Sequence, residues 1–220
     1  MTFEIPNDLM VSVSGVRGRV GEALTPEVVA RFAAAFGAYL REKAGNGRPK
    51  VVLGRDSRTS GPMFASVAAA ALQSVGCDVV DIGLAPTPTT LFAIRHHDAQ
   101  GAIVVTASHN PVEWNALKFA SSAGMFLDAD EGPHMRAYLS DRPLPYAGWD
   151  GLGVATRDGK AAQRHVDAVL RIPYLDVEGL RKRRFKVALD CIRGAGTQVL
   201  PRLLEALGCD VVGLNMEPDG

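Results

Sequence analysis

Residues 102–111 read Ala102-Ile103-Val104-Val105-Thr106-Ala107-Ser108-His109-Asn110-Pro111. The apolar, β-branched first half is typical of a buried strand, and the small and polar second half ends in an Asn-Pro turn. A hydroxyl and an imidazole therefore stand where a strand gives way to a loop, which is where α/β proteins place ligands. The same residues also fit an ordinary buried strand followed by a polar turn. The stretch by itself leaves both interpretations open.

Strand and helix patterns alternate around this stretch. The residues favour strands at 11–13, 50–53, 77–82 and 100–106. Thr25 and Pro26 are typical of a helix start, and further helices are expected at 63–75, 88–97 and 160–170. This alternation is typical of α/β proteins.

An internal repeat indicates two domains of one design. Residues 50–80 run through strand, loop, helix and strand, and residues 186–212 repeat the passage. A Pro- and Gly-rich stretch between Asp141 and Gly159 is the expected boundary, giving domains at 1–150 and 151–220. The second domain looks cut short, because a two-stranded remnant cannot bury both faces of its sheet.

Composition limits the classes of partner. Lysine plus arginine equals aspartate plus glutamate at 24 each, and 47% of residues are hydrophobic. This balance gives no electrostatic reason to expect nucleic acid or a membrane surface as a partner. No segment has the length of a membrane span, and we expect a cytoplasmic protein. The three cysteines form no C-x-x-C pair, so we expect buried, reduced thiols.

Two further segments carry arginines in loop-like sequence. Ser14-Gly15-Val16-Arg17-Gly18-Arg19 is expected to form a tight loop in which glycines bracket Arg17. Gly54-Arg55-Asp56-Ser57-Arg58 follows a strand and precedes a helix, where arginines could face a phosphate. In both segments the arginines could equally be solvated or order the loop.

A lysine follows Ser108 after ten residues. Lys118 lies in Trp114-Asn115-Ala116-Leu117-Lys118-Phe119, a segment that could fold back beside the serine. A serine next to a base is the arrangement of a covalent nucleophile. The sequence has no G-x-S-x-G elbow, and Gly194-Ala195-Gly196 is only a weak start of a dinucleotide-binding fingerprint.

Five short motifs of this sequence resemble motifs of the α-D-phosphohexomutase family and occur in the same order. They are Ser14–Gly18, Gly54–Arg58, Pro86–Pro88, Thr106–Pro111 and Asn115–Lys118. Ala116 departs from the glycine more usual at that position, and Trp114 replaces a common tyrosine. The form Trp-Asn-Ala-Leu-Lys is similar to that of phosphoglucosamine mutases. With the resemblance, we expect a three-layer α/β/α domain with a mixed, mostly parallel sheet, followed by a partial second domain of the same design.

The resemblance implies a mutase that interconverts hexose 6-phosphate and hexose 1-phosphate. Ser108 would carry a phosphoryl group, donate it to the hexose phosphate and pass through a bisphosphorylated intermediate. Lys118 would act as general base or acid, Arg17 would stabilise the transferring phosphoryl group, and His109 would hydrogen-bond to substrate or phosphoserine. The residues expected to bind substrate or phosphate are Arg55, Arg58, Asn110 and Asn115.

The resemblance also implies Mg²⁺, because a phosphoserine adds about −1.5 to −2 charge. Ser108 would bind the ion through its phosphate. The resemblance implies a four-domain protein with an aspartate-rich metal loop. This sequence has no such Asp-x-Asp-x-Asp loop. We therefore expect the ion's aspartate ligands in missing C-terminal domains of the same protein, and we expect the 220-residue piece alone to be inactive. The alternative functions are phosphomannomutase or phosphoglucomutase activity, or a phosphosugar-binding module without turnover.

Overall fold

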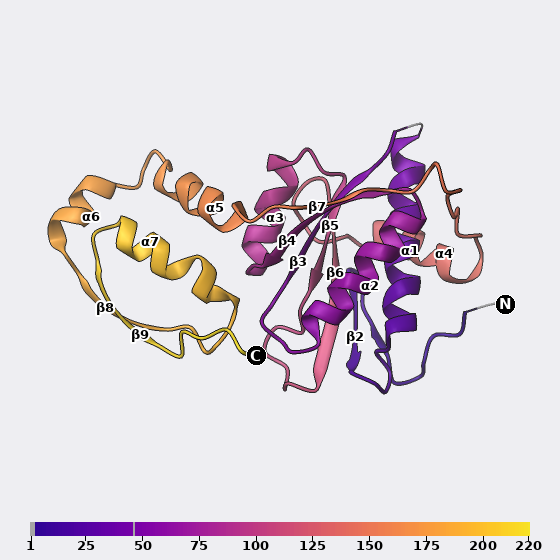
Figure 1. The fold of residues 1–220 in the computed structure, drawn as a ribbon, viewed down its shortest axis with the longest axis horizontal. Coiled ribbons are helices and arrows are strands. Elements are labelled where there is room, and N and C mark those ends of the chain that lie inside the picture. Colours follow the sequence, from indigo (N-terminus) through magenta and orange to yellow (C-terminus); the bar gives the residue numbers. More distant parts are fainter. Residues whose placement is uncertain (1–2, 46) are drawn as a thin grey trace.

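The computed structural model describes residues 3–45 and 47–220, so Met1, Thr2 and Asn46 lie outside the described residues. Figure 1 shows a larger unit that contains the main sheet and, beside it, a smaller unit with β8 and β9. The main sheet has the order β1-β2-β6-β5-β3-β4-β7. Its strands are β1 (Met10–Val11), β2 (Gly15–Arg19), β3 (Lys50–Arg55), β4 (Asp78–Leu84), β5 (Gly101–Val105), β6 (Trp114–Ser121) and β7 (Ala155–Arg157).

The main sheet is mixed, and the two-stranded sheet is parallel. Within the described residues, the pairings β3–β4, β3–β5, β4–β7 and β8–β9 are parallel, and β1–β2, β2–β6 and β5–β6 are antiparallel. The parallel strands are joined by helices, as crossover connections require. The chain after β5 instead turns back at the Ser108 loop into β6, which pairs with β5 from Val105↔Leu117 to Gly101↔Ser121.

Helices cover both faces of the main sheet and make it the middle of three layers (Figure 1). The helices α1, α2 and α4 pack on one face, and α3 and α5 supply residues to the cluster on the other. Their bounds are α1 (Pro26–Ala44), α2 (Gly61–Ser74), α3 (Thr87–His96), α4 (Glu131–Ser140) and α5 (Ala161–Leu170).

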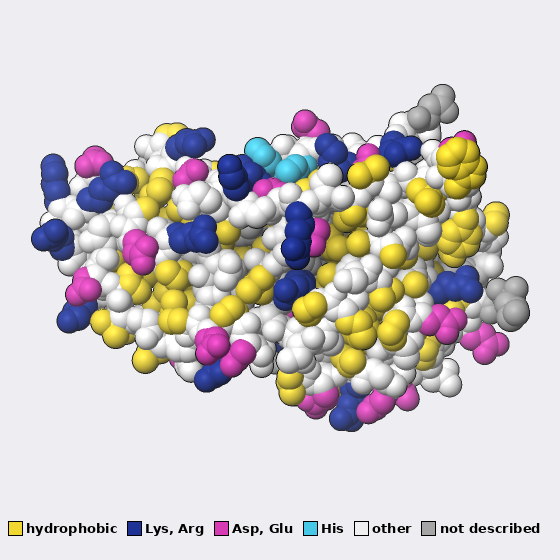
Figure 2. Space-filling view, viewed as in Figure 1, with side chains coloured by type: hydrophobic (Ala, Val, Ile, Leu, Met, Phe, Trp, Pro, Cys, Tyr) yellow, Lys and Arg dark blue, Asp and Glu magenta, His cyan; other side chains and the backbone are white. Residues whose placement is uncertain are grey.

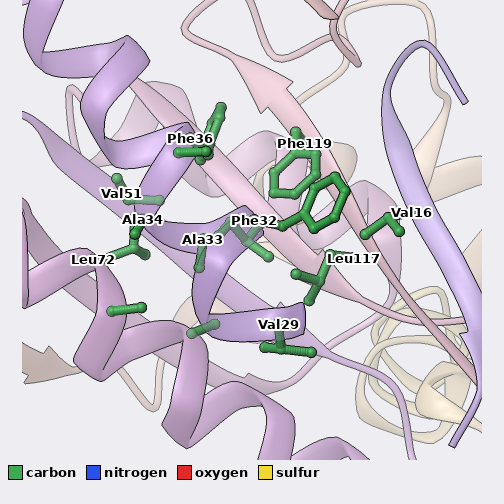
Figure 3. Close-up of a cluster of buried hydrophobic side chains, with 14 of the residues drawn as sticks. Val16, Val29, Phe32, Ala33, Ala34, Phe36, Val51, Leu72, Leu117 and Phe119 are labelled. Carbon is green, nitrogen blue, oxygen red and sulfur yellow. The ribbon is translucent and has the colours of Figure 1, made fainter. Parts of the chain in front are cut away.

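The larger hydrophobic cluster lies between α1 and the sheet. Phe32 and Phe36 of α1 face Phe119 of β6, with ring centroids 6.5 Å and 5.0 Å from that of Phe119 (Figure 3). These rings are at most 1% exposed. Because α1 has its apolar residues at helical spacing, it presents this stripe to the sheet and not to solvent.

These observations confirm the expected fold class. The helix start is also confirmed, since Thr25 caps α1 by accepting a hydrogen bond from the Val28 amide at 3.4 Å. The expectation of a tight loop at residues 14–19 is wrong, because Gly15–Arg19 is strand β2, paired with β1 and β6. Gly15 marks a close backbone approach: a Cβ there would lie 2.6 Å from the Leu117 carbonyl oxygen.

The smaller unit repeats the strand-helix-strand passage. It contains α6 (Val177–Arg183), β8 (Lys186–Asp190), the 3₁₀ turn η1 (Ala195–Gln198), α7 (Leu200–Ala206) and β9 (Asp210–Leu214). β8 and β9 pair in parallel, as the repeat predicts. The domain boundary at residue 150 stays a prediction; β7, which follows it, pairs with β4 of the main sheet.

The cysteines are free thiols. Cys77 and Cys191 are buried and Cys209 is half-buried. Burial raises the pKa of the Cys77 thiol to about 12, because the thiolate would be poorly solvated there. Among the described residues, no helix combines the length and the apolar composition that a bilayer crossing needs.

Candidate active site

The candidate site begins with the Ser108 loop, which joins β5 to β6. Ser108 is exposed and has a left-handed backbone conformation, with φ of 58°. Its amide donates a hydrogen bond to Thr106 Oγ1 at 3.0 Å, and its hydroxyl lies 3.3 Å from His109 Nδ1. The hydroxyl is thus available to solvent on a loop whose backbone is fixed by its neighbours.

Arg17 and Lys118 come from the strands beside this loop. In the β2–β6 pairing Arg17 lies opposite Ala116, and Gly15 lies opposite Lys118. Side chains alternate along a strand. Because the intervening Val16 and Leu117 belong to the cluster under α1, Arg17 and Lys118 lie on the other face of the sheet.

A cavity of about 360 Å³ brings these groups together, with Arg17, Ser108 and Lys118 in its lining. Arg17 Nη1 donates to Asn110 Oδ1 at 3.1 Å, so it also contacts the serine loop. The Lys118 ammonium lies 5.5 Å from the centroid of the Phe126 ring. A hydroxyl, a guanidinium and an ammonium thus border one hollow, which suits an anionic ligand.

A second cleft, of about 620 Å³, also borders the serine loop and has Ser108 in its lining. It is bordered by His109 and Asn110 of the larger unit and, in the smaller unit, by Asp190 at the end of β8 and by Cys191 and Ile192 in the loop that follows. The repeat predicted a second strand-and-loop unit. It did not predict that the loop of that unit would face Ser108, because packing between units leaves no local signal.

Arg58 is placed differently from the phosphate-binding role expected for it. Its side chain is buried and donates to Asp56 and to backbone carbonyls of residues 108–114. Its contacts therefore order the loop, which was the alternative open from the sequence. Arg55 is half-buried and donates through Nη1 to the Asp56 carbonyl at 3.1 Å.

Asn115 is also placed differently, because it is completely buried. Its side-chain amide donates to Ser60 Oγ at 2.8 Å, and its side-chain carbonyl accepts from the Ala116 amide at 2.8 Å. These contacts correct the expected substrate contact to a role in joining β6 to the start of α2.

Sequence reasoning missed two residues beside the site, Thr106 and Phe126. Thr106 accepts a hydrogen bond from the backbone amide of Ser108, two residues further along the chain. Threonine side chains often bind nearby backbone groups in this way, so the sequence could have predicted this contact. Phe126 reaches Lys118 from the turn after β6, and no spacing rule would have paired them.

No resident metal site is built by these residues alone. Among residues 3–45 and 47–220, no three His, Cys, Asp or Glu side chains are grouped so that they could hold a metal ion. The described residues do not fit Mg²⁺ without further ligands.

Fold and site together define a class: three-layer α/β/α proteins that present an exposed serine at a strand end beside cationic side chains. Comparison with family models identifies the class further. Residues 9–141 match phosphoglucomutase/phosphomannomutase alpha/beta/alpha domain I, and residues 163–220 match domain II of the same family. The chain belongs to the phosphoglucomutase/phosphomannomutase family.

Individual relatives agree with this assignment. The chain is 39% identical to a phosphoglucomutase/phosphomannomutase of Thermococcus kodakarensis, covering 94% of this chain and 44% of that protein. It is 37% identical to a probable phosphoglucosamine mutase of Methanopyrus kandleri, covering 94% and 43%. The crystal structure of a putative phosphomannomutase from Thermus thermophilus superimposes with a TM-score of 0.80 at 28% identity, covering 99% of this chain and 47% of that one. The chain thus spans less than half the length of these relatives.

Proposed function

We propose that this chain forms the serine-bearing part of a phosphohexomutase, which interconverts hexose 6-phosphate and hexose 1-phosphate. The observation that carries the proposal is the cavity shared by Ser108, Arg17 and Lys118 in a chain of this family. A phosphoryl group on an exposed serine needs cations nearby and an open path for a sugar hydroxyl. The cavity offers both.

The proposed transfer uses groups of this chain. A substrate hydroxyl attacks the phosphorus on Ser108, and the new O–P bond forms as the bond to the Ser108 oxygen breaks. Lys118, once deprotonated to the neutral amine, takes the hydroxyl proton and returns it to the leaving Ser108 oxygen, which restores the serine hydroxyl. Arg17 stabilises the charge on the transferring group. The bisphosphorylated intermediate then turns, and its other phosphate returns to Ser108.

Three further residues have proposed supporting roles. His109 Nδ1, 3.3 Å from the Ser108 hydroxyl, is proposed to hydrogen-bond with that oxygen or with substrate. Asn110, which accepts from Arg17, is proposed to contact phosphate at the same place. Arg55 is proposed to meet a substrate phosphate at the carboxyl end of β3.

Mg²⁺ remains part of the proposal. The ion would neutralise charge on the phosphoserine, and its aspartate ligands would lie outside this chain. Because those ligands are missing, we propose that the 220-residue chain alone does not convert hexose phosphates. The smaller unit supports this, because apolar side chains of and beside its two strands are exposed, among them Phe185, Val212 and Leu214. Figure 2 shows hydrophobic side chains on the surface of this unit.

The preferred substrate is proposed to be glucosamine phosphate. The motif Trp114-Asn115-Ala116-Leu117-Lys118 supports this substrate. So do two relatives, a probable phosphoglucosamine mutase of Methanopyrus kandleri and a phosphoglucosamine mutase of Clostridioides difficile. The relative named phosphoglucomutase/phosphomannomutase supports glucose or mannose phosphate as the second candidate.

The test is an assay of the whole protein that carries this chain, with glucosamine, glucose and mannose phosphates as substrates. We expect turnover with at least one of them, and Ser108→Ala to lower it by about 10⁴- to 10⁶-fold, because a covalent nucleophile is lost. Ser121→Ala, at a half-buried serine at the end of β6, is the matched control. Near-normal turnover of Ser108→Ala would refute the assignment of the nucleophile.

A further inference from the structure

Arg58 has every donor of its guanidinium committed to the protein. Nε donates to Asp56 Oδ2 at 3.2 Å. Nη1 donates to the carbonyls of Pro111 and Trp114, at 2.7 Å and 3.0 Å. Nη2 donates to the carbonyls of Ser108 and Asn110, at 3.1 Å and 2.6 Å. An arginine side chain has five N–H donors, so none is left for a substrate phosphate.

The surroundings of Arg58 fix it in this arrangement. The residue is 8% exposed, and Asp56 holds it twice, through Nε and through the Arg58 backbone amide at 3.1 Å. A buried cation is tolerated when it is paired with a carboxylate and its hydrogen bonds are satisfied. Asp56 therefore orients the guanidinium, whose planar fork then meets four carbonyls of one short segment.

The segment that Arg58 holds is the one that carries the proposed nucleophile. Both backbone groups of Ser108 are hydrogen-bonded: its amide donates to Thr106 Oγ1 at 3.0 Å, and its carbonyl accepts from Arg58 at 3.1 Å. Fixing the peptide groups on both sides of a residue fixes its φ and ψ, and hence the direction of its side chain. In Ser108 this holds a left-handed conformation, φ 58°, that residues other than glycine seldom adopt.

We propose that Arg58 is a positioning residue for phosphoryl transfer: it sets the left-handed conformation that aims the Ser108 oxygen into the cavity with Arg17 and Lys118, and it does not touch substrate. The expected effect of Arg58 on the reaction rate rests on the proposed function. Its effect on the conformation of the serine loop rests on the hydrogen bonds alone. Lysine cannot replace this arginine, because it has three donors and no planar fork. An Arg58→Lys variant leaves at least two of the five acceptors without their donor.

The matched control is Arg41. It also donates to two backbone carbonyls, those of Val75 and Pro145, at 3.0 Å and 3.1 Å, but these lie outside the serine loop. Arg41→Lys makes the same chemical change and tests whether the loss of arginine-to-carbonyl bonds anywhere in the molecule has the same effect.

The experiment compares the wild type, Arg58→Lys and Arg41→Lys in the whole protein, by steady-state kinetics and by hydrogen exchange of backbone amides. We expect Arg58→Lys to lower kcat by about 10²-fold, the typical effect of a misplacement near 1 Å, with KM changed by less than about threefold. Amides of residues 106–116 should exchange faster in this variant alone. Arg41→Lys should keep its kcat.

Two results would overturn the proposal. A raised KM with unchanged kcat would show that Arg58 binds substrate, and unchanged exchange in residues 106–116 would show that it does not hold the loop. If the wild type had no mutase turnover, the proposed function would fall, and exchange alone would decide the role of Arg58. If Arg58→Lys did not fold, Thr106→Val would serve instead, because it removes the hydrogen bond from the Ser108 amide at similar side-chain volume. Thr106→Val should then lower kcat to the same extent, and Thr106→Ser, which keeps the hydroxyl, should have the wild-type kcat.

Discussion

Ser108 combines an exposed hydroxyl with a backbone conformation that costs free energy. A left-handed conformation costs an L-amino acid roughly 1–2 kcal/mol, and glycine avoids this cost. The loop keeps a serine at φ 58° because its neighbours hold both of its peptide groups. Strained backbone conformations of this kind cluster at functional sites.

A stability prediction follows at this residue. The free energy of unfolding of Ser108→Gly should exceed that of Ser108→Ala by about 1 kcal/mol, because the positive φ strains alanine and does not strain glycine. Urea unfolding of both variants, with the slope of each transition compared, measures the difference. An alanine variant at least as stable as the glycine variant would show that the loop relaxes to another conformation.

At single residues, the sequence could predict which side chains gather but not what each one binds. Ser108 and Lys118 were expected to come together because residues 114–119 were expected to fold back, and both border the same cavity. The residues alone left Arg58 open between binding a phosphate and ordering the loop, and the substrate contact expected of Asn115 came from the family resemblance. Besides the nearby Asp56, Arg58 binds backbone carbonyls of residues 108–114, and Asn115 binds Ser60; only the folded chain brings these distant partners within reach.

Among the elements, those with strong periodicity could be predicted and β2 could not. The stripe of α1 and the apolar run of β5 each match one template, and both elements form close to the expected residues. In β2 the glycines at 15 and 18 are typical of a turn. Gly15 is needed because β6 passes too closely for a side chain, a long-range fact with no signature in the local sequence.

This difference matters for the site. A loop would leave the Arg17 side chain free to move, whereas strand β2 fixes it opposite Ala116 and on the face that Lys118 shares. The alternation of Val16 and Arg17 between the two faces of the sheet is therefore what directs Arg17 toward the serine loop.

At the scale of the whole molecule, α5 joins the two units, because it packs on α3 of the larger unit and also contacts α7 of the smaller one. His165 of α5 lies with Nδ1 2.9 Å from Thr89 Oγ1, and its ring stacks on Phe92 at 5.2 Å between centroids. Burial lowers the pKa of His165 below its ordinary value of 6.5, because a charged imidazole would be poorly solvated there.

This histidine predicts a pH dependence of stability. As pH falls through about 6.5, the unfolded chain takes up a proton at His165 before the folded chain does, so the stabilisation present above that pH is lost. Between about pH 7.5 and about pH 5, the wild type should lose more unfolding free energy than His165→Asn, whose amide can still bond to Thr89. Urea unfolding at several pH values measures this. Parallel losses in the two proteins would contradict it.

The charge of the whole molecule is balanced, with 24 basic and 24 acidic side chains. Both signs are spread over the face drawn in Figure 2, so attraction of a phosphate depends on local groups. The cavity beside Ser108 supplies them through Arg17 and Lys118. The central claim is therefore local, namely that Ser108 carries and transfers a phosphoryl group.

The most direct test is to identify the phosphorylated residue by mass spectrometry of peptides from the whole protein. After treatment with a hexose 1,6-bisphosphate, the account predicts one phosphate on Ser108, which leaves the serine and appears as hexose bisphosphate when hexose monophosphate is added. Turnover by a protein in which Ser108 stays unmodified throughout would contradict the account.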